Sequence, residues 1–192
     1  MKYCRGVTLV ELMIAIVVMG ILTAMAVPNY QEWMKSQQVR NITENIQNGI
    51  RTAQMEAVRR NQPVTFWMVS SLDNNCALAV GPTWIVGNQS ANGNLDAGTT
   101  DPSGQCDNTF LQRAAGTGGT TGITITSTGN ANCVAFNGFG QVAQTDPTCT
   151  NPISRVTATV TSTGKARAIT INNGNILLCD PALPSSDPRG CK

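Results

Sequence analysis

The sequence predicts an α+β fold in which one long N-terminal helix packs on antiparallel β-sheets. The first observation is a long uncharged apolar run near the start, which continues into apolar residues spaced three and four apart up to Arg60. The second is that the chain beyond Pro63 consists of short runs rich in Val, Ile and Thr, separated by Gly, Asn or Pro. We therefore expect a helix with two unlike halves, followed by one small β-rich domain.

A short basic leader, residues 1–6, precedes a segment long enough to cross a membrane. The run from Leu12 to Val27 carries no charge, and Val7 to Val27 has 21 residues, close to the roughly 20 that a hydrocarbon core requires. Lys2 and Arg5 would keep the leader in the cytoplasm by the positive-inside bias. The sequence thus predicts a single-pass transmembrane helix with the rest of the chain across the membrane.

One acidic residue, Glu11, stands near the start of this segment. A carboxylate at bilayer depth is tolerated only where a partner compensates it. A cut after Gly6 would place a new amino terminus, on Val7, about one turn from Glu11. In a bundle of such helices, that amine could equally pair with the Glu11 of a neighbour. We therefore interpret Glu11 as an assembly residue.

The run GVTLVELMIAIVVMGILTAMAVP, which begins at Gly6 and ends at Pro28, resembles the prepilin signature of type IV pilins and type II secretion pseudopilins. The family usually has Phe as its first mature residue, where this chain has Val7. The resemblance implies cleavage between Gly6 and Val7 by a prepilin peptidase, N-methylation of Val7, and assembly roles for Glu11 and Pro28. It also implies a single pass of the inner membrane with a periplasmic domain, followed by assembly with other pilin and minor pilin subunits into a pilus or pseudopilus.

Two other interpretations of the N-terminal segment stay open. Ala24-Met25-Ala26 is a passable signal-peptidase site, although an apolar signal region usually has roughly 7 to 15 residues and would not carry a Glu near its start. A plain membrane anchor would share the topology and lack only the assembly role. The mass of the mature N-terminus separates cleavage before Val7 from cleavage after Ala26.

The next segment, residues 29–62, has the pattern of an amphipathic helix. Pro28 lies within the continuous helical pattern and should kink the helix, and Asn61-Gln62-Pro63 should end it. Only this half can pack on a globular domain, so the half before it must pack against lipid or other subunits. The apolar stripe that predicts the packing face consists of Val39, Ile42, Ile46, Ile50, Ala53 and Ala57.

The remainder, residues 63–192, is expected to form a β-rich globular domain with a disulfide-bonded C-terminal region. Thr163-Gly164 and Asn173-Gly174 lie between alternating runs and predict hairpins. The predicted strands are 64–70, 76–80, 83–86, 110–113, 122–128, 132–136, 141–144, 155–162, 166–172 and 176–179, and 87–105 is predicted to be a surface loop.

RTAQMEAVRRNQPVTFWMV, residues 51–69, resembles the helix end and first strand of the GspH/FimT branch of minor pilins and pseudopilins. The resemblance covers nearly the whole chain, is strong over the first 70 residues and is weakest at the end. It implies the type IV pilin fold and a subunit that is incorporated in a type IV pilus or primes it, serving adhesion, twitching motility or DNA uptake. The pseudopilin of a type II secretion system is the alternative.

Six cysteines follow the leader, an even number on the exported side, which predicts up to three disulfides. Six cysteines allow 15 connectivities, and the sequence does not choose among them. We prefer Cys179 with Cys191, because they bracket a short Pro-rich segment. No C-x-x-C spacing and no His occur, so neither a zinc site nor another cofactor is expected. The candidates for disulfides are Cys76, Cys106, Cys133, Cys149, Cys179 and Cys191.

The composition argues against catalysis. His, the commonest general base, is absent, and most Asp residues stand beside Gly, Asn or Pro, as is typical of turns. Removing Lys2 and Arg5 from 13 basic residues leaves 11, equal to the 11 acidic ones, so no global field favours nucleic acid. We expect a non-enzymatic subunit.

One local group of basic residues remains, near the C-terminus. Gly164-Lys165-Ala166-Arg167 resembles the G-R-x-R motif by which some FimT-type pilins contact DNA, with Lys in place of the first Arg. The resemblance makes a pilus-borne DNA receptor for natural transformation a third interpretation, and a merely solvated face is the alternative. Contacts would be to phosphates and strongly salt-dependent. The candidate DNA-binding residues are Lys165, Arg167, Arg189 and Lys192.

Overall fold

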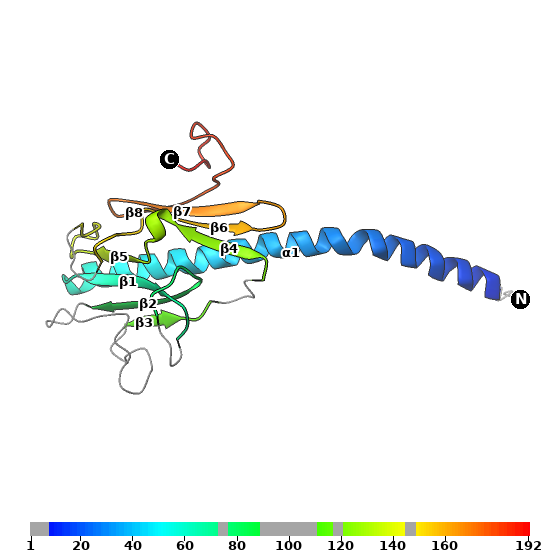
Figure 1. Ribbon diagram of the computed structural model, residues 1–192, viewed down its shortest axis with the longest axis horizontal. Helices are drawn as coiled ribbons and strands as arrows, with labels where there is room; N and C mark the ends of the chain where they lie inside the picture. Colours follow the sequence, from blue (N-terminus) through cyan, green and yellow to red (C-terminus); the bar gives the residue numbers. More distant parts are fainter. Residues whose placement is uncertain (1–7, 73–76, 89–110, 117–120, 145–148) are drawn as a thin grey trace, which may run out of the picture.

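A long helix leads into two β-sheets (Figure 1). The computed structural model describes residues 8–72, 77–88, 111–116, 121–144 and 149–192, without the side chains of residues 25–29, 88 and 113. Helix α1 (Leu9–Arg60) has 52 residues. Thr8 caps its start by accepting a hydrogen bond at Oγ1 from the backbone N–H of Glu11, 3.3 Å away. Asn61 ends it in the left-handed conformation, at φ 50°.

The end of α1 confirms the predicted helix stop at Asn61. Helix α1 is one continuous element that includes Pro28, so the kink expected there stays a prediction. Within the described residues, no helix has an apolar stretch that meets the length and hydropathy needed to cross a membrane. The membrane crossing expected of residues 7–28 includes Val7 and the side chains of residues 25–28, which lie outside the described part.

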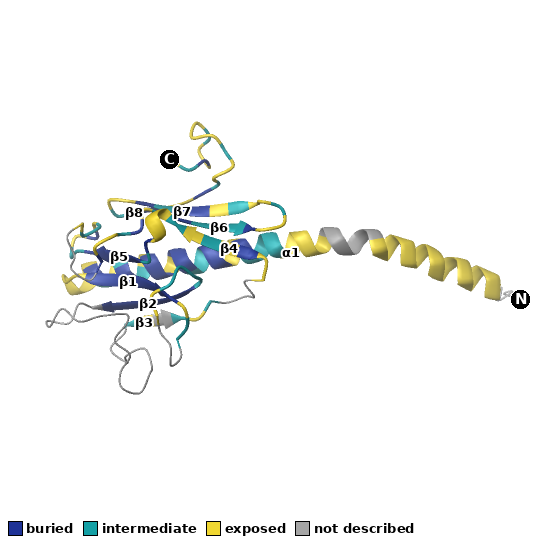
Figure 2. Cartoon of the chain, viewed as in Figure 1, coloured by how far each residue is buried: buried dark blue, intermediate teal, exposed yellow. Residues whose placement is uncertain are grey.

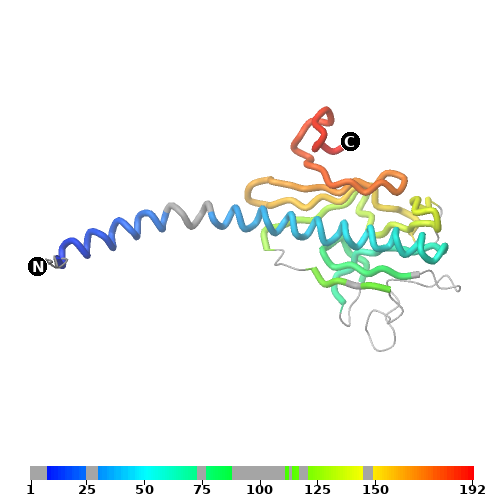
Figure 3. Tube along the Cα trace, turned by 180° about the vertical axis from the view of Figure 1, so that it is seen from behind, coloured from blue at the N-terminus to red at the C-terminus, as the bar shows by residue number. Residues whose placement is uncertain are grey.

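The strands form two antiparallel sheets. One has the order β3-β2-β1-β5 and the other the order β4-β6-β7-β8. Helix α1 contacts strands of both sheets and runs between them (Figure 3). The first sheet consists of β1 (Val64–Val69), β2 (Thr83–Asn88), β3 (Gln112–Ala114) and β5 (Cys133–Phe136). The second sheet consists of β4 (Ile123–Ser127), β6 (Arg155–Val160), β7 (Ala166–Asn172) and β8 (Asn175–Cys179). The 3-10 helix η1 (Thr128–Asn130) lies between β4 and β5 in the chain.

The predicted stripe on the second half of the helix forms the centre of the core. All six of its residues, from Val39 to Ala57, are at most 2% exposed. They pack against aromatic side chains of the first sheet, such as Phe66 and Trp84, and against aliphatic side chains of the second, such as Ile169. Figure 2 shows the same division: α1 is buried between the sheets and exposed beyond them. Burial of this stripe is therefore what joins the two sheets into one domain.

The predicted hairpins are confirmed at both turns. Asn173 and Gly174 connect β7 to β8 with φ values of 46° and 93°, as a two-residue turn of type I′ requires. Gly164, at φ 68°, lies in the turn between β6 and β7. Two predicted strands are wrong: 141–144 contributes a single bridge, from Val142 to Phe136, and the described part of 76–80 contributes one, from Leu78 to Val69. Both are too short to form a ladder.

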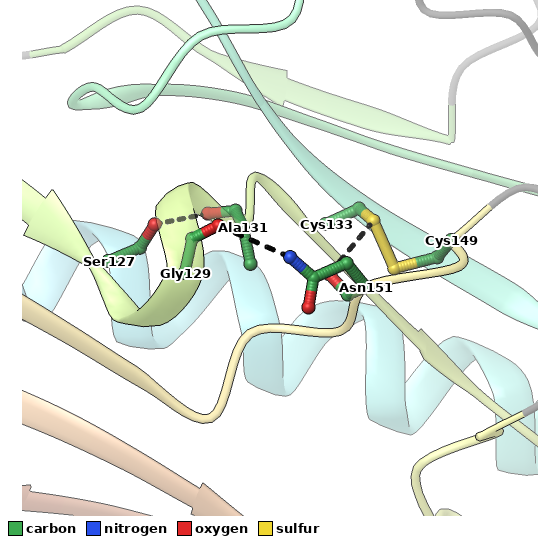
Figure 4. The surroundings of a disulfide bond; sticks show 6 residues. All are labelled: Ser127, Gly129, Ala131, Cys133, Cys149 and Asn151. Carbon is green, nitrogen blue, oxygen red and sulfur yellow. Dashed lines mark hydrogen bonds between the residues drawn. A yellow bond between two sulfur atoms is a disulfide. The ribbon is translucent and has the colours of Figure 1, made fainter.

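Within the described part of the chain, two disulfides link loop residues to strands β5 and β8. Cys133 on β5 is bonded to Cys149, and Figure 4 shows this bond beside η1, with Asn151 Nδ2 donating to the carbonyl of Gly129, 3.3 Å away. The preferred pairing of Cys179 with Cys191 is confirmed. Cys76 and Cys106 lie outside the described residues, so their pairing stays open.

Candidate assembly surface

The N-terminal half of α1 presents an apolar surface that the domain does not cover. Its side chains are largely exposed, for example Leu9 at 74% and Met19 at 70%. A contiguous apolar surface of this kind marks an interaction site, because soluble monomers rarely expose large ones. The other large apolar side chains exposed on this half are Val10, Leu12, Met13, Ile14, Ile16, Val17, Val18, Ile21 and Leu22.

A shallow hollow of about 540 Å³ runs along one side of this half. A Cβ at Gly20 would meet no atom within 4 Å, so the helix surface is open at this point. Small residues such as Ala15 and Gly20 allow another helix to approach closely. The hollow therefore fits an apolar helix, and the hydroxyl of Thr23 in its lining donates to the carbonyl of Met19 on the same helix, 2.7 Å away. It is lined by Leu12, Ala15, Ile16, Met19, Gly20, Thr23 and Ala24.

Glu11 lies in the first turn of α1, where the helix dipole favours a negative charge. Its side chain is exposed, and it makes no salt bridge with any residue that the structure describes. The carboxylate is thus free to accept a partner from outside the subunit. Gly6 and Val7, the residues of the predicted cleavage and methylation sites, lie outside the described residues.

The basic residues predicted near the C-terminus are not four free cations. Arg167 Nη1 lies 3.9 Å from Asp180 Oδ2, and Arg189 Nη2 lies 3.2 Å from Asp187 Oδ2. The Arg189 guanidinium lowers the pKa of Asp187, chiefly through their side-chain hydrogen bond. Lys165 and Lys192 are exposed and have no salt bridge within the described part of the chain.

The C-terminal disulfide folds the last segment back toward β7. Asp180 donates its backbone N–H to the carbonyl of Arg189, 2.8 Å away, so the two ends of the loop run together beside Cys179 and Cys191. A cavity of about 170 Å³ lies where this loop, β7 and α1 meet. It is lined by Ser36, Val39, Lys165, Ala166, Arg167, Asp180 and Ala182.

Sequence reasoning missed an aromatic pair where α1 leaves the domain. The ring centroids of Tyr30 and Trp33 are 5.9 Å apart, and the two residues are 61% and 55% exposed. A signal was available, because these are the first aromatic residues after the uncharged run that ends at Val27.

The comparisons with known proteins agree with this geometry. Residues 43–175 match the family described as type II transport protein GspH, and residues 1–27 match the prokaryotic N-terminal methylation motif. The chain belongs to the GspH family. The two matches cover the exposed half of α1 and most of the two-sheet domain, up to the start of β8. They identify a minor pilin or pseudopilin of the type IV pilin family with the α+β pilin fold.

Individual relatives match about a third of the chain. The chain is 32% identical over 71 residues to the type IV major fimbrial protein FimA of Dichelobacter nodosus, covering 35% of this chain and 44% of FimA. It is 34% identical over 64 residues to a fimbrial protein of Pseudomonas aeruginosa, covering 33% and 41%. The match thus spans less than half the length of these relatives.

The fold extends further than the sequence identity. The crystal structure of the type IV minor pilin FimU of Pseudomonas aeruginosa aligns with a TM-score of 0.52 at 15% identity, covering 83% of this chain and 99% of that one. This likeness concerns the fold alone, and it supports the predicted pilin architecture of a long helix on antiparallel sheets.

Proposed function

We propose that this GspH-family chain is a minor pilin that is incorporated in a type IV pilus or primes its assembly, without catalytic activity. The observation that carries the proposal is the exposed apolar half of α1, which carries Glu11 in its first turn without a salt bridge to any described residue and follows a prepilin-type N-terminal motif. In this role a prepilin peptidase cuts after Gly6 and Val7 is methylated. The subunit waits in the inner membrane, with its domain in the periplasm, until it joins its neighbours.

Assembly would be mechanical. Transfer of the apolar half of α1 from lipid into a helix bundle depends on close packing, because lipid is as apolar as the helices themselves. The hollow along Ala15 and Gly20 offers the close approach that such packing requires. Glu11 adds register, since a buried carboxylate demands a cationic partner, and the amine of an adjacent Val7 is the natural one.

The role of Glu11 is tested by replacing Glu11 with Ala in the native bacterium. We expect the variant to reach the membrane with both described disulfides formed, but to be reduced at least about tenfold in sheared filaments, in keeping with the 3–5 kcal/mol that breaking a buried charge pair costs. Glu32→Ala on the exposed part of the same helix is the matched control. Normal incorporation of the Glu11 variant would remove the assigned role.

The choice between a pilus and a type II secretion pseudopilus requires a separate experiment. Deletion of the gene should abolish or reduce surface pili and leave protein secretion intact if the chain is a minor pilin. Loss of secretion with pili retained would assign it to the secretion system instead. Complementation with the unaltered chain is the control.

DNA reception finds less support from the geometry. Arg167 and Arg189 each lie beside a carboxylate, which lowers the positive potential that phosphate binding needs. A DNA receptor is therefore the alternative. Binding to duplex DNA that weakens steeply as salt is added would establish it.

A further inference from the structure

The end of the domain from which α1 emerges combines exposed aromatic rings with basic side chains. Tyr30 and Trp33 form a tilted ring pair on α1. Ser36, one turn beyond Trp33, lines the 170 Å³ cavity together with Lys165 and Arg167 of the β6–β7 region. Trp33 and the basic cavity therefore lie about one helical turn apart along α1, and Tyr30 lies nearly two turns from it.

A third cation borders the same end. A Cβ placed on Gly122, directly before β4, would lie 3.7 Å from the Nζ of Lys35, so the Lys35 ammonium lies over the start of that strand. In Figure 1 the start of β4 and the turn between β6 and β7 both face the exposed part of α1. The carboxylates nearest in the chain or cavity are Glu32 and Asp180. This end of the domain thus carries three cations and two carboxylates, of which Arg167 and Asp180 are paired.

The position of these groups along α1 matches the layers of a bilayer. At 1.5 Å per residue, Tyr30 lies about 4.5 Å and Trp33 about 9 Å beyond Val27, the last residue of the uncharged run. The polar layer on each side of a hydrocarbon core is roughly 5 to 8 Å thick. The two rings therefore fall in or at the edge of the headgroup layer, where Tyr and Trp are enriched. Lys and Arg side chains can reach back into it.

We propose that Tyr30, Trp33, Lys35, Lys165 and Arg167 form a docking surface for anionic phospholipid headgroups, which holds the domain against the membrane before assembly. The inference rests on the proposed membrane-inserted subunit. The rings lie in the headgroup layer, Lys165 contacts a lipid phosphate at the mouth of the cavity, and Arg167 divides its charge between this phosphate and Asp180. Extraction into a filament breaks these contacts.

Trp33 provides a built-in probe. The chain has three Trp, and the other two, Trp67 and Trp84, are only 1% and 3% exposed, so a quencher in lipid should reach Trp33 alone. The full chain is reconstituted in phosphatidylcholine bilayers with and without phosphatidylglycerol, with nitroxide quenchers placed either on the headgroup or in mid-chain. We expect the headgroup label to quench more than the mid-chain label, and Trp33→Phe to remove this difference.

The cations are tested in the same bilayers. Adding phosphatidylglycerol should increase quenching by the headgroup label. Lys165→Gln should lower the ratio of docked to undocked domain about fivefold, which corresponds to the about 1 kcal/mol that each cation contributes near an anionic surface. Arg51→Gln, an exposed cation farther along α1, is the matched control and should change nothing. Lys165→Arg should keep the effect.

Several outcomes would overturn the inference. Equal quenching with and without phosphatidylglycerol, or Trp33 open to aqueous iodide in both, would show that no headgroup surface exists. Binding of duplex DNA that depends on Lys165 and is unchanged by lipid would assign the cations to nucleic acid instead. Flotation with vesicles distinguishes failure of the headgroup surface from failure of the proposed function. A chain that does not float with the vesicles is not inserted in the membrane, and the proposed function then fails as well.

Discussion

The side-chain amide of Gln54 joins α1 to two loops that lie far apart in the sequence. Its Nε2 donates to the carbonyl of Gly140, 2.8 Å away, and to the carbonyl of Gly174, 2.7 Å away. Gly174 has a φ of 93°, and a Cβ added there would clash with the Gly140 carbonyl, so this position requires glycine. One amide thus fixes the end of the β7–β8 hairpin against the helix.

Replacing Gln54 with Ala should lower the free energy of unfolding by about 2 kcal/mol, because each of the two bonds contributes about 1 kcal/mol and two partly buried carbonyls lose their donor. Urea unfolding of the chain in detergent measures this as a lower midpoint at unchanged slope. Gln31→Ala, on the exposed part of α1, is the control. A shift of less than about 0.5 kcal/mol would mean that water replaces the amide.

A second residue-scale feature is Glu56, which receives hydrogen bonds from both Arg59 and Arg60. The bond from Arg60, then that from Arg59, lowers the pKa of Glu56 from its ordinary value of 4.5. Because the folded pKa is the lower one, the contribution is complete above the unfolded pKa and is lost as the pH falls toward the folded value. Pairs one turn apart on a solvated helix surface stabilise by about 0.3–0.5 kcal/mol each.

Glu56→Gln should therefore lower the free energy of unfolding by about 0.5–1 kcal/mol at pH 7 and by almost nothing near pH 3. Thermal unfolding at both pH values measures the difference. The exposed Glu32, changed in the same way, should show no such pH dependence. An equal loss at both pH values would indicate a packing effect rather than the charge pair.

At the scale of elements, the C-terminal disulfide and its loop form one unit. Cys179 ends β8, and the bond to Cys191 closes a loop over a sequence separation of 12 residues. Replacing both cysteines with Ser should reduce stability by about 3 kcal/mol on the chain-entropy model. Limited proteolysis should then cut within 180–190, while β6 and β7 stay protected because Val156 and Ile169 keep their burial in the core.

The outcome that would contradict this is a loop that stays resistant to protease without the bond. The backbone hydrogen bonds from Asp180 to Arg189 and from Gly190 to Asp187 would then suffice to hold it. A variant lacking the Cys133–Cys149 bond serves as the comparison, since that bond lies at the other sheet.

The elements that could be predicted from the sequence are those that depend on interactions between residues close together in the chain. The stripe from Val39 to Ala57 and the Asn173-Gly174 hairpin depend on neighbours three or four residues apart, or on one dipeptide, so local pattern suffices. The contacts of Gln54 cross 86 and 120 residues, and nothing in the local pattern distinguishes Gln54 from any other helical Gln. The wrong strand at 141–144 has strand-forming residues but is held by only one bridge.

The candidate site divides in the same way. Glu11 and the apolar half of α1 were predictable, because a lone acid in an uncharged run is visible in the sequence. The pairing of Arg167 with Asp180 was not, since it depends on the fold of the C-terminal loop. A cluster of basic letters therefore overstates the positive charge that this surface presents.

At the scale of the whole molecule, α1 performs two separable tasks along one rod. Within the described residues, Val39 is the first residue of α1 that belongs to the buried core. Before it, the large exposed apolar side chains continue to Met34, and the next one on α1 is Met55. The domain should thus fold without the half of the helix that serves assembly.

Chains beginning at residues 29, 35 and 44 test this division. The first two should be soluble and unfold at the same urea concentration, because residues 30–34, which distinguish them, are exposed. Exposed substitutions usually change stability by less than about 0.5 kcal/mol. The third loses Val39 and Ile42, which are 2% and 1% exposed, and should be less stable by at least about 4 kcal/mol, since buried aliphatic side chains contribute about 2 kcal/mol or more each. A marked difference between the first two would show that the aromatic pair at Tyr30 and Trp33 stabilises the domain itself, and the two tasks of α1 would then overlap at that point.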